Sequence, residues 1–259
     1  MSAKKVLVTG ATGRTGALVV EKLRCFPEEF EVFGLARSPA KVEERFGNTD
    51  GFYFGDIRDR STLETALEGC DALVILTSAV PKMQTPPQPG QRPQFDFEPG
   101  GRPEEVDFHG QVNQIDVAQA AGIEQIVLVG SMGGTNENHP LNRIGDGNIL
   151  VWKRKAEEYL MHSGIDYTII RAGGLLDQPG GVRELIVGHN DELLAHPPDD
   201  IPTSIPRADV AEVVVQALRQ PNSHNTAFDI ISRPEDDPNA KVTEDFAALF
   251  AQAAAASVS

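Results

Sequence analysis

The stretch Val6-Leu7-Val8-Thr9-Gly10-Ala11-Thr12-Gly13-Arg14-Thr15-Gly16 determines the fold expected for this chain. It joins a buried apolar strand, a loop of spacing G-x-x-G-x-x-G and the start of a helix. Gly10 permits a tight exit from the strand, Gly13 lets backbone N–H groups approach a pyrophosphate, and Gly16 allows close packing of helix on strand. Because the amino terminus of the helix offers unpaired N–H donors, the stretch predicts a dinucleotide-binding loop.

The rest of the chain alternates between strand-like and helix-like segments. We expect strands at 30–36, 51–55, 71–78, 125–130, 167–172 and 227–231, and helices at 15–26, 40–46, 61–69, 104–121, 150–163, 209–220 and 243–255. Ser61 and Glu64 form a capping-box pattern, which predicts that the third helix begins at Ser61. The succession predicts an α/β protein with a Rossmann-type doubly wound parallel sheet and a small C-terminal elaboration on the substrate side. A single domain is expected over residues 1–259.

Two segments are expected to lie over the site. Seven prolines between Pro81 and Pro103 exclude a core helix or a central strand there. A loop of this length is either a functional lid or an irregular insertion. Its position after the fourth expected strand favours a functional role, because ligands of such sheets bind beyond the strand carboxyl ends. Residues 174–206 form the second segment, on the substrate side.

The composition argues against several classes of function. The 259 residues carry a net charge of −15, which disfavours binding to nucleic acids or to anionic membrane surfaces. No apolar run reaches the roughly 18 residues of a membrane span. The two cysteines, Cys25 and Cys70, and the spacing of the histidines give no metal-binding motif. Because the chain starts directly in a strand pattern, we expect no signal or transit peptide and a cytoplasmic location.

The end of the second expected strand indicates which dinucleotide binds. NAD-binding folds carry an acidic residue there, which accepts hydrogen bonds from the ribose. This strand instead ends in Ala36-Arg37-Ser38, and the Arg37 guanidinium is suited to a 2′-phosphate. Arg14 in the glycine loop can assist from the other side. We therefore expect NADP(H) as the cofactor; the alternative is that Arg37 is a solvated surface residue.

Four further motifs resemble those of the atypical short-chain dehydrogenase/reductase proteins. They are Gly55-Asp56-Ile57, Trp152–Glu157 (WKRKAE), Tyr167–Gly174 (YTIIRAGG) and Pro206–Ala211 (PRADVA). Within that family, the chain resembles the plant and algal NAD(P)-binding branch, which is related to the dehydrogenase-like component of the chloroplast inner-envelope translocon and to NmrA-like proteins. The resemblance implies a Rossmann fold, NADP(H) and, if a transit peptide has been removed, a location in the chloroplast stroma.

The resemblance also assigns cofactor contacts to the glycine loop and to the ends of the later strands. In chain order, these are Gly10, Thr12, Gly13, Arg14 and Thr15 for the pyrophosphate, Arg37 for the 2′-phosphate, Asp56 and Ile57 for the adenine, Thr77, Ser78 and Ala79 for the inner ribose and phosphate, Ser131 and Lys153 beside the nicotinamide, and Ala172, Gly173 and Gly174 near the carboxamide.

Ser131 and Lys153 are the residues to which the resemblance assigns the chemistry. Dehydrogenases of this superfamily place a tyrosine four residues before the lysine, where it transfers the proton that accompanies the hydride. Here that position is Ile149, and none of the three tyrosines is followed by a lysine at that spacing. The proton donor therefore stays open, with Asp177, His109 and a water relay through Lys153 as candidates.

Two functions from different classes remain. The first is an NADP(H)-dependent oxidoreductase of a small carbonyl, enone or quinone, with residues 81–103 and 174–206 closing its pocket. The second is a non-catalytic NADP(H) sensor or scaffold acting on a protein partner, as the NmrA-like resemblance implies. The missing tyrosine favours the sensor, whereas Lys153 and Ser131 favour the oxidoreductase. A third function, that of an epimerase, is disfavoured because it would need the same missing tyrosine for proton transfer. We expect the oxidoreductase; the sequence determines neither the substrate nor the oligomeric state.

Overall fold

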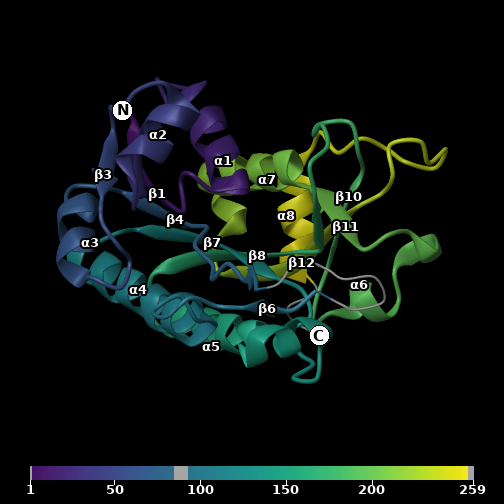
Figure 1. The fold of residues 1–259 in the computed structure, drawn as a ribbon. Helices are drawn as coiled ribbons and strands as arrows, with labels where there is room; N and C mark the ends of the chain where they lie inside the picture. The colour runs from purple at the N-terminus through teal and green to yellow at the C-terminus, as the bar shows by residue number, and fades with distance from the viewer. Residues whose placement is uncertain (1, 85–92, 256–259) are drawn as a thin grey trace.

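An eight-stranded sheet forms the centre of the protein in the computed structural model, which describes residues 2–84 and 93–255 (Figure 1). Its strand order is β10-β12-β8-β7-β4-β1-β2-β3. In chain order these strands are β1 (Lys4–Thr9), β2 (Phe30–Ala36), β3 (Phe52–Phe54), β4 (Ala72–Ile75), β7 (Gln125–Ser131), β8 (Asp166–Ala172), β10 (Leu185–Gly188) and β12 (Thr226–Ser232). All neighbours pair in parallel except the edge strand β10, which runs antiparallel to β12.

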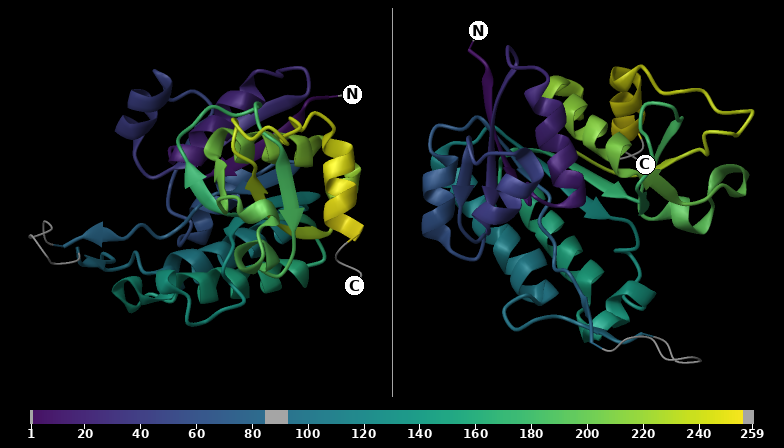
Figure 2. Two further views of the ribbon diagram at one scale, coloured as in Figure 1. Left: turned by 90° about the vertical axis from the view of Figure 1, so that its right-hand side faces the viewer. Right: turned by 45° about the horizontal axis from the view of Figure 1, so that its top comes forward.

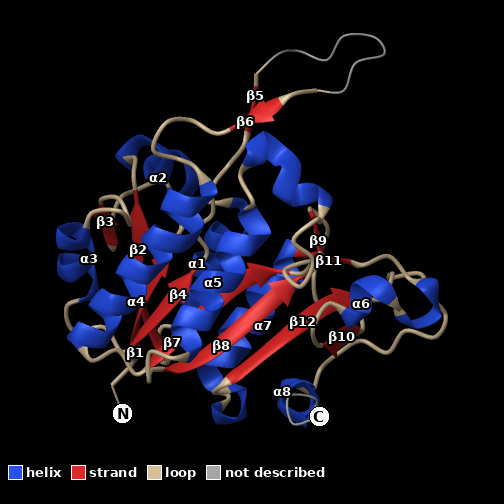
Figure 3. Ribbon diagram, turned by 90° about the horizontal axis from the view of Figure 1, so that it is seen from below, coloured by secondary structure: helices blue, strands red, loops and turns tan. Residues whose placement is uncertain are grey.

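Helices cover both faces of this sheet (Figures 1 and 3). The α-helices are α1 (Arg14–Arg24), α2 (Pro39–Phe46), α3 (Arg60–Leu67), α4 (Gly110–Ala121), α5 (Ile149–Met161), α6 (Glu192–Ala195), α7 (Arg207–Arg219) and α8 (Phe246–Ala255). Short turns of other helix types are η1 (Glu104–His109), η2 (Pro140–Asp146), η3 (Pro198–Asp200) and η4 (Pro221–Ser223). Apolar residues of α1, α7 and α8 pack one face, and those of α3, α4 and α5 pack the other. The predicted Rossmann-type doubly wound sheet is confirmed.

The strand order indicates where in this sheet a ligand binds. β1 pairs with β2 on one side and with β4 on the other, so the winding direction reverses between β1 and β4. These strands are buried because Val6, Leu7 and Val8 of β1 and the residues of β4 are apolar on both faces. Ligands of such sheets bind beyond the carboxyl ends at the reversal point. The glycine loop after β1 lies at this position.

Most expected elements shift by one to three residues at an end, and three differences have a clear structural cause. Helix α3 begins at Arg60 rather than Ser61, because the Asp59 carboxylate caps it by accepting a hydrogen bond from the Ser61 amide at 3.0 Å. The strand expected over 71–78 ends at Ile75, since its neighbour β1 leaves the sheet directly after Thr9. The helix expected over 104–121 divides into the π-helical turn η1 and α4.

The two segments expected over the site have regular structure, and the later one, 174–206, also supplies β10 to the edge of the central sheet. In the proline-rich segment, β5 (Lys82–Met83) and β6 (Phe95–Asp96) form an antiparallel pair that projects from the body of the protein (Figures 2 and 3). The middle of the expected loop, residues 85–92, lies outside the described residues. In the later segment, β9 (Gly174–Leu176) pairs in parallel with β11 (Ser204–Pro206). Within 2–84 and 93–255, no helix has the length and apolar character needed to cross a membrane.

Candidate functional site

The residues expected to bind the cofactor lie along one edge of the sheet. In the order of the chain, Gly10, Thr12, Gly13, Arg14 and Thr15 form the loop after β1 and the start of α1, Arg37 follows β2, Asp56 and Ile57 follow β3, Thr77, Ser78 and Ala79 follow β4, Ser131 ends β7, Lys153 lies on α5, Ala172 ends β8, and Gly173 and Gly174 lead into β9. The parallel strands therefore bring these separate segments to a common edge.

The glycine loop has the geometry of an anion-binding turn. Gly10 has a φ of +69°, and a Cβ at this residue would lie 2.7 Å from the Leu76 carbonyl oxygen. A Cβ at Gly16 would lie only 2.2 Å from the Gly10 carbonyl oxygen. Gly13 is the N-cap of α1, and among the described residues no side chain caps this helix. The N–H groups of its first turn are open to an anion, so the loop fits a pyrophosphate.

Glutamine side chains of α4 hold the ends of β1 and β4 together. The buried Thr9 hydroxyl donates to Oε1 of Gln114 at 2.6 Å, and Nε2 of Gln114 lies 3.2 Å from the Thr77 hydroxyl oxygen. Nε2 of Gln111 donates to the Thr77 carbonyl oxygen at 3.4 Å. These bonds fix Thr77 beside the glycine loop, at the reversal point of the sheet.

The expected adenine end carries two arginines around one carboxylate. Asp56 accepts hydrogen bonds from Nε and Nη2 of Arg58 at 2.8 and 2.7 Å. The Arg58 side chain holds the pKa of Asp56 below its usual value, and the charge of Arg37 acts in the same direction. Arg37 itself is exposed, and its guanidinium makes no hydrogen bond or ion pair within the described part of the chain. It is therefore free to receive a phosphate.

Lys153 is buried and held by a carboxylate that the sequence analysis missed. Its side chain is 11% exposed, and Nζ lies 2.6 Å from Oδ1 of Asp107, which is completely buried in η1. Oδ2 of Asp107 accepts a hydrogen bond from the Ala79 amide at 2.9 Å. Asp107 thus connects the lysine of α5 to the chain that follows β4. A buried ion pair of this kind is costly to desolvate, so its place at the ligand edge of the sheet indicates a functional site.

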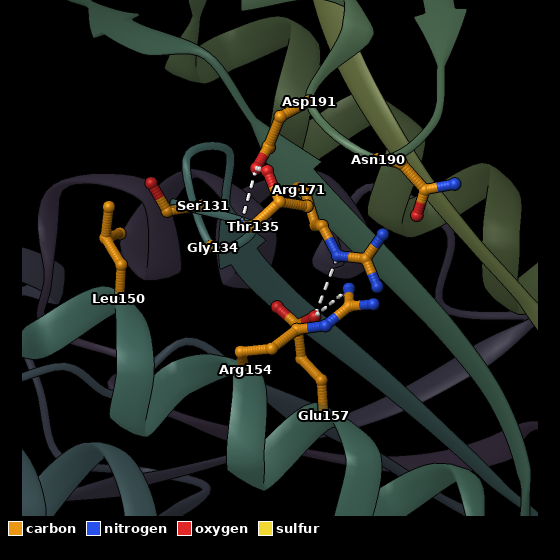
Figure 4. A pocket seen from close by; sticks show the side chains of 9 residues that line it. All are labelled: Ser131, Gly134, Thr135, Leu150, Arg154, Glu157, Arg171, Asn190 and Asp191. Atoms are coloured by element: carbon orange, nitrogen blue, oxygen red, sulfur yellow. Dashed lines mark hydrogen bonds and ion pairs between the residues drawn. The ribbon is translucent and has the colours of Figure 1, made fainter. Parts of the chain in front are cut away.

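Ser131 lies at the mouth of a small pocket between α5 and β8 (Figure 4). The Ser131 hydroxyl donates to the Met132 carbonyl oxygen at 3.1 Å. The other lining residues are Gly134, Thr135, Leu150, Arg154, Glu157, Arg171, Asn190 and Asp191. Lys153 is not among them, since it faces Asp107 instead.

Buried charged side chains form a network around this pocket. Nε of Arg171 donates to Glu157 at 2.7 Å, and Nη1 of Arg171 lies 3.8 Å from Oδ1 of Asp229. Oδ2 of Asp229 accepts from the Asp191 amide at 2.6 Å. The Asp191 carboxylate in turn accepts hydrogen bonds from the amides of Gly133 and Thr135 at 2.6 and 2.8 Å. The network therefore ties the chain after Ser131 to the ends of β8 and β12.

The protonation of Asp229 is expected to make stability depend on pH. Burial raises the pKa of Asp229 to about 6. Because the folded protein then binds this proton more tightly than the unfolded chain, ionised Asp229 lowers stability progressively as the pH rises from about 4 to about 6. The Asp229→Asn variant has a neutral amide in place of this carboxyl group, so it does not titrate in this range. Urea unfolding across pH 4 to 7 should show the stability of wild type relative to the variant falling over this window and then levelling off. A difference that does not change with pH contradicts the assignment.

The structure shows the surroundings of the three tyrosines and of the proton-donor candidates His109 and Asp177. The Tyr159 hydroxyl donates to Asp116 at 2.6 Å, Tyr53 is on the edge strand β3, and Tyr167 is at the start of β8, opposite the ligand edge. His109 is exposed, with its ring 5.1 Å from that of Phe108. Asp177 pairs with Arg14 and Arg207. In the described residues, no group of three His, Cys, Asp or Glu side chains forms a metal site.

Three polar residues of the site that were not predicted have a helical spacing in the sequence. Asp107, Gln111 and Gln114 are spaced by four and three positions, so they share one face of a helix. That face also carries the buried Ile115 and Ala118. Polar side chains on the buried face of a helix need partners inside the protein, and here those partners are Lys153 and the chain beyond β4.

Comparison with known proteins identifies the family of this chain. The family model for NAD(P)H-binding proteins matches residues 10–221. An uncharacterised chloroplastic protein of Arabidopsis thaliana is 56% identical over 249 residues, which are 95% of this chain and 74% of that protein. Sanguinarine reductase of Eschscholzia californica is 48% identical over 275 residues, covering 97% of each chain. A wide-type short-chain dehydrogenase/reductase of Veillonella parvula, solved with NADP, has a TM-score of 0.61 at 15% identity over 91% of this chain and 95% of its own.

The chain belongs to the NAD(P)H-binding family. The expected family resemblance and cofactor are confirmed. The similarity to a reductase favours the expected oxidoreductase. The part that each site residue plays stays a prediction, as does the single domain expected over residues 1–259.

Proposed function

We propose that the protein uses NADP(H) to reduce a small carbonyl, enone or quinone. The buried pair of Lys153 and Asp107 carries this proposal, because it holds a cation at the ligand edge of the sheet beside the end of β4. Ser131 supplies a hydroxyl from the neighbouring strand β7. The similarity to a reductase over nearly the whole chain supports catalysis over simple cofactor binding.

The protein's own residues would bind and orient both reactants. When NADPH is bound, it supplies the hydride that reaches the electrophilic carbon. Lys153 has three N–H groups, of which one faces Asp107, so the others are available for the hydroxyls of the nicotinamide ribose. Ser131 can turn its hydroxyl from the Met132 carbonyl oxygen to the substrate oxygen. Asp107 is then a positioning residue that acts through Lys153.

The reduced substrate oxygen also needs a proton. Ile149 stands where the superfamily has a tyrosine, and an aliphatic side chain cannot supply one. We assign this proton to the Lys153 ammonium, acting through a water molecule and recharged from solvent. This assignment needs no residue beyond those already at the site.

Turnover can be tested by following the loss of NADPH absorbance against aldehydes, enones and quinones. Sanguinarine belongs in this panel because of the similar reductase. NADPH oxidation that depends on both substrate and protein supports the proposal. NADPH binding without turnover of any member of the panel would favour the alternative, a cofactor sensor with a protein partner, which Ile149 in place of tyrosine makes worth testing. Capture of a partner with and without NADPH is then the next experiment.

Arg37→Ala should weaken NADPH binding selectively. Loss of a guanidinium bonded to the 2′-phosphate removes about 1.5–3 kcal/mol, or roughly 10- to 150-fold in affinity, while NADH affinity stays unchanged. Fluorescence titration of both cofactors measures this. Arg45→Ala is a matched control, since Arg45 lies on α2, the helix that follows Arg37, and pairs with Glu21 at 3.2 Å. Equal losses for NADH and NADPH would remove the proposed role of Arg37.

We also propose that the protein works in the chloroplast. The proposal rests on the Arabidopsis thaliana relative, which is described as chloroplastic and is 56% identical. A cytoplasmic location is the alternative. Immunodetection in isolated chloroplasts and in the cytosolic fraction distinguishes the two.

A further inference from the structure

Two arginines from distant parts of the chain meet on one carboxylate beside the glycine loop. Oδ2 of Asp177, just after β9, forms an ion pair with Nη2 of Arg14, the first residue of α1. Oδ1 of Asp177 accepts a hydrogen bond from Nε of Arg207, the first residue of α7, at 3.0 Å. Each arginine thus takes a different oxygen of the same carboxylate. Arginines converge in the same way on a phosphate group.

The three side chains differ in how much of each is exposed to solvent. Arg207 is only 16% exposed, whereas Arg14 and Asp177 are 64% and 55% exposed. Arg207 therefore has little water around it, and such a cation binds an anion more strongly than a solvated one. Arg14 and Asp177 have the freedom to exchange partners.

The segment that carries Asp177 has a second attachment. The Gly181 amide donates to the buried carboxylate of Asp209, on the first turn of α7, at 2.6 Å. Gly180 packs so closely on this turn that an added Cβ would lie 2.9 Å from the Cβ of Ala208. The Asp177 side chain can therefore leave the arginines while its segment stays docked on α7.

We propose that Arg14 and Arg207 bind the diphosphate of NADP(H), and that Asp177 occupies this two-arginine site until the cofactor displaces it. Arg14 belongs to the loop already expected to bind the pyrophosphate, and its shared carboxylate places Arg207 in the same site. The carboxylate also keeps two like charges close together before the cofactor arrives. The proposal concerns binding alone, so it stands or fails independently of hydride transfer.

The test compares NADPH with 2′-AMP, which has the adenosine and 2′-phosphate but no diphosphate. Asp177→Asn keeps a hydrogen-bond acceptor for Arg207 and removes the competing charge. It should tighten NADPH binding about fivefold and leave 2′-AMP unchanged. Arg207→Gln should weaken NADPH binding at least about tenfold, again with little change for 2′-AMP. Arg207→Lys should recover part of the loss, because it restores the charge without the planar fork.

Arg219→Gln is the control for Arg207→Gln. Arg219 lies at the opposite end of the same helix, also pairs with a carboxylate, Glu29, and should leave NADPH affinity unchanged. Thermal unfolding of each variant shows whether it is folded. NADPH affinity that falls or stays the same in Asp177→Asn overturns the displacement. Equal changes for NADPH and 2′-AMP overturn the assignment to the diphosphate.

Discussion

Gly16→Ala is expected to abolish measurable NADPH binding and to lower the free energy of unfolding by about 3 kcal/mol. The added Cβ would lie 2.2 Å from the carbonyl oxygen of Gly10 and 2.9 Å from its carbonyl carbon. Both contacts are with backbone, so no flexible side chain can move to relieve them. Helix α1 must shift away from β1, and the N–H groups of its first turn then no longer point into the glycine loop.

Gly13→Ala gives a graded comparison for Gly16→Ala. Gly13 has a φ of −72°, which any residue adopts, and its added Cβ would lie 3.0 Å from the same carbonyl oxygen. A shift of a few tenths of an ångström relieves this contact, so stability should fall by about 1 kcal/mol and NADPH binding should weaken but persist. Gly101→Ala, with its nearest neighbour at 3.4 Å, should change neither. Titration with NADPH and urea unfolding measure both effects, and near-normal NADPH affinity in Gly16→Ala would refute the assigned pyrophosphate site.

Lys153→Met is expected to reduce both stability and activity. The substitution leaves the Asp107 carboxyl group without its cation in a place with no exposure to solvent, where its remaining hydrogen bond comes from the Ala79 amide. Removing one partner of a buried ion pair costs about 3–5 kcal/mol. Turnover should fall at least about a hundredfold, because a hundredfold is the lower limit of what a positioned proton donor contributes to the rate. Urea unfolding and steady-state rates with an active member of the substrate panel measure the two effects.

A double variant separates the two consequences of Lys153→Met. Replacing both partners, as in Lys153→Met with Asp107→Leu, removes the unpaired charge and should recover most of the lost stability. Turnover should stay as low as in the single variant, because the cation is still missing. If the double variant regains activity along with stability, Lys153 has only a structural role and the proposed mechanism is wrong.

Much of the fold and the cofactor loop is determined by local sequence patterns. The apolar residues of β1, β4, β7 and β8 are buried on both faces, as their runs predict, and the glycine spacing after β1 permits the turn that the structure shows. These features depend on neighbours close in the chain. The start of α3 was misplaced because Asp59 and Ser61 are both good N-caps, and only the backbone geometry shows which one the helix uses.

The pairing of charged groups depends instead on how distant segments of the chain pack together. Lys153 was recognised by its motif, but its partner Asp107 lies in another helix, and the η1 turn brings that carboxylate to both Nζ and the Ala79 amide. Asp177 appeared as a possible proton donor, whereas the packing of α1 beside α7 places it between Arg14 and Arg207. A glycine spacing specifies a turn because the constraint is steric and local. A buried or shared charge takes as its partner whichever group the packing of distant segments brings within about 3 Å, and no short pattern in the sequence encodes that choice.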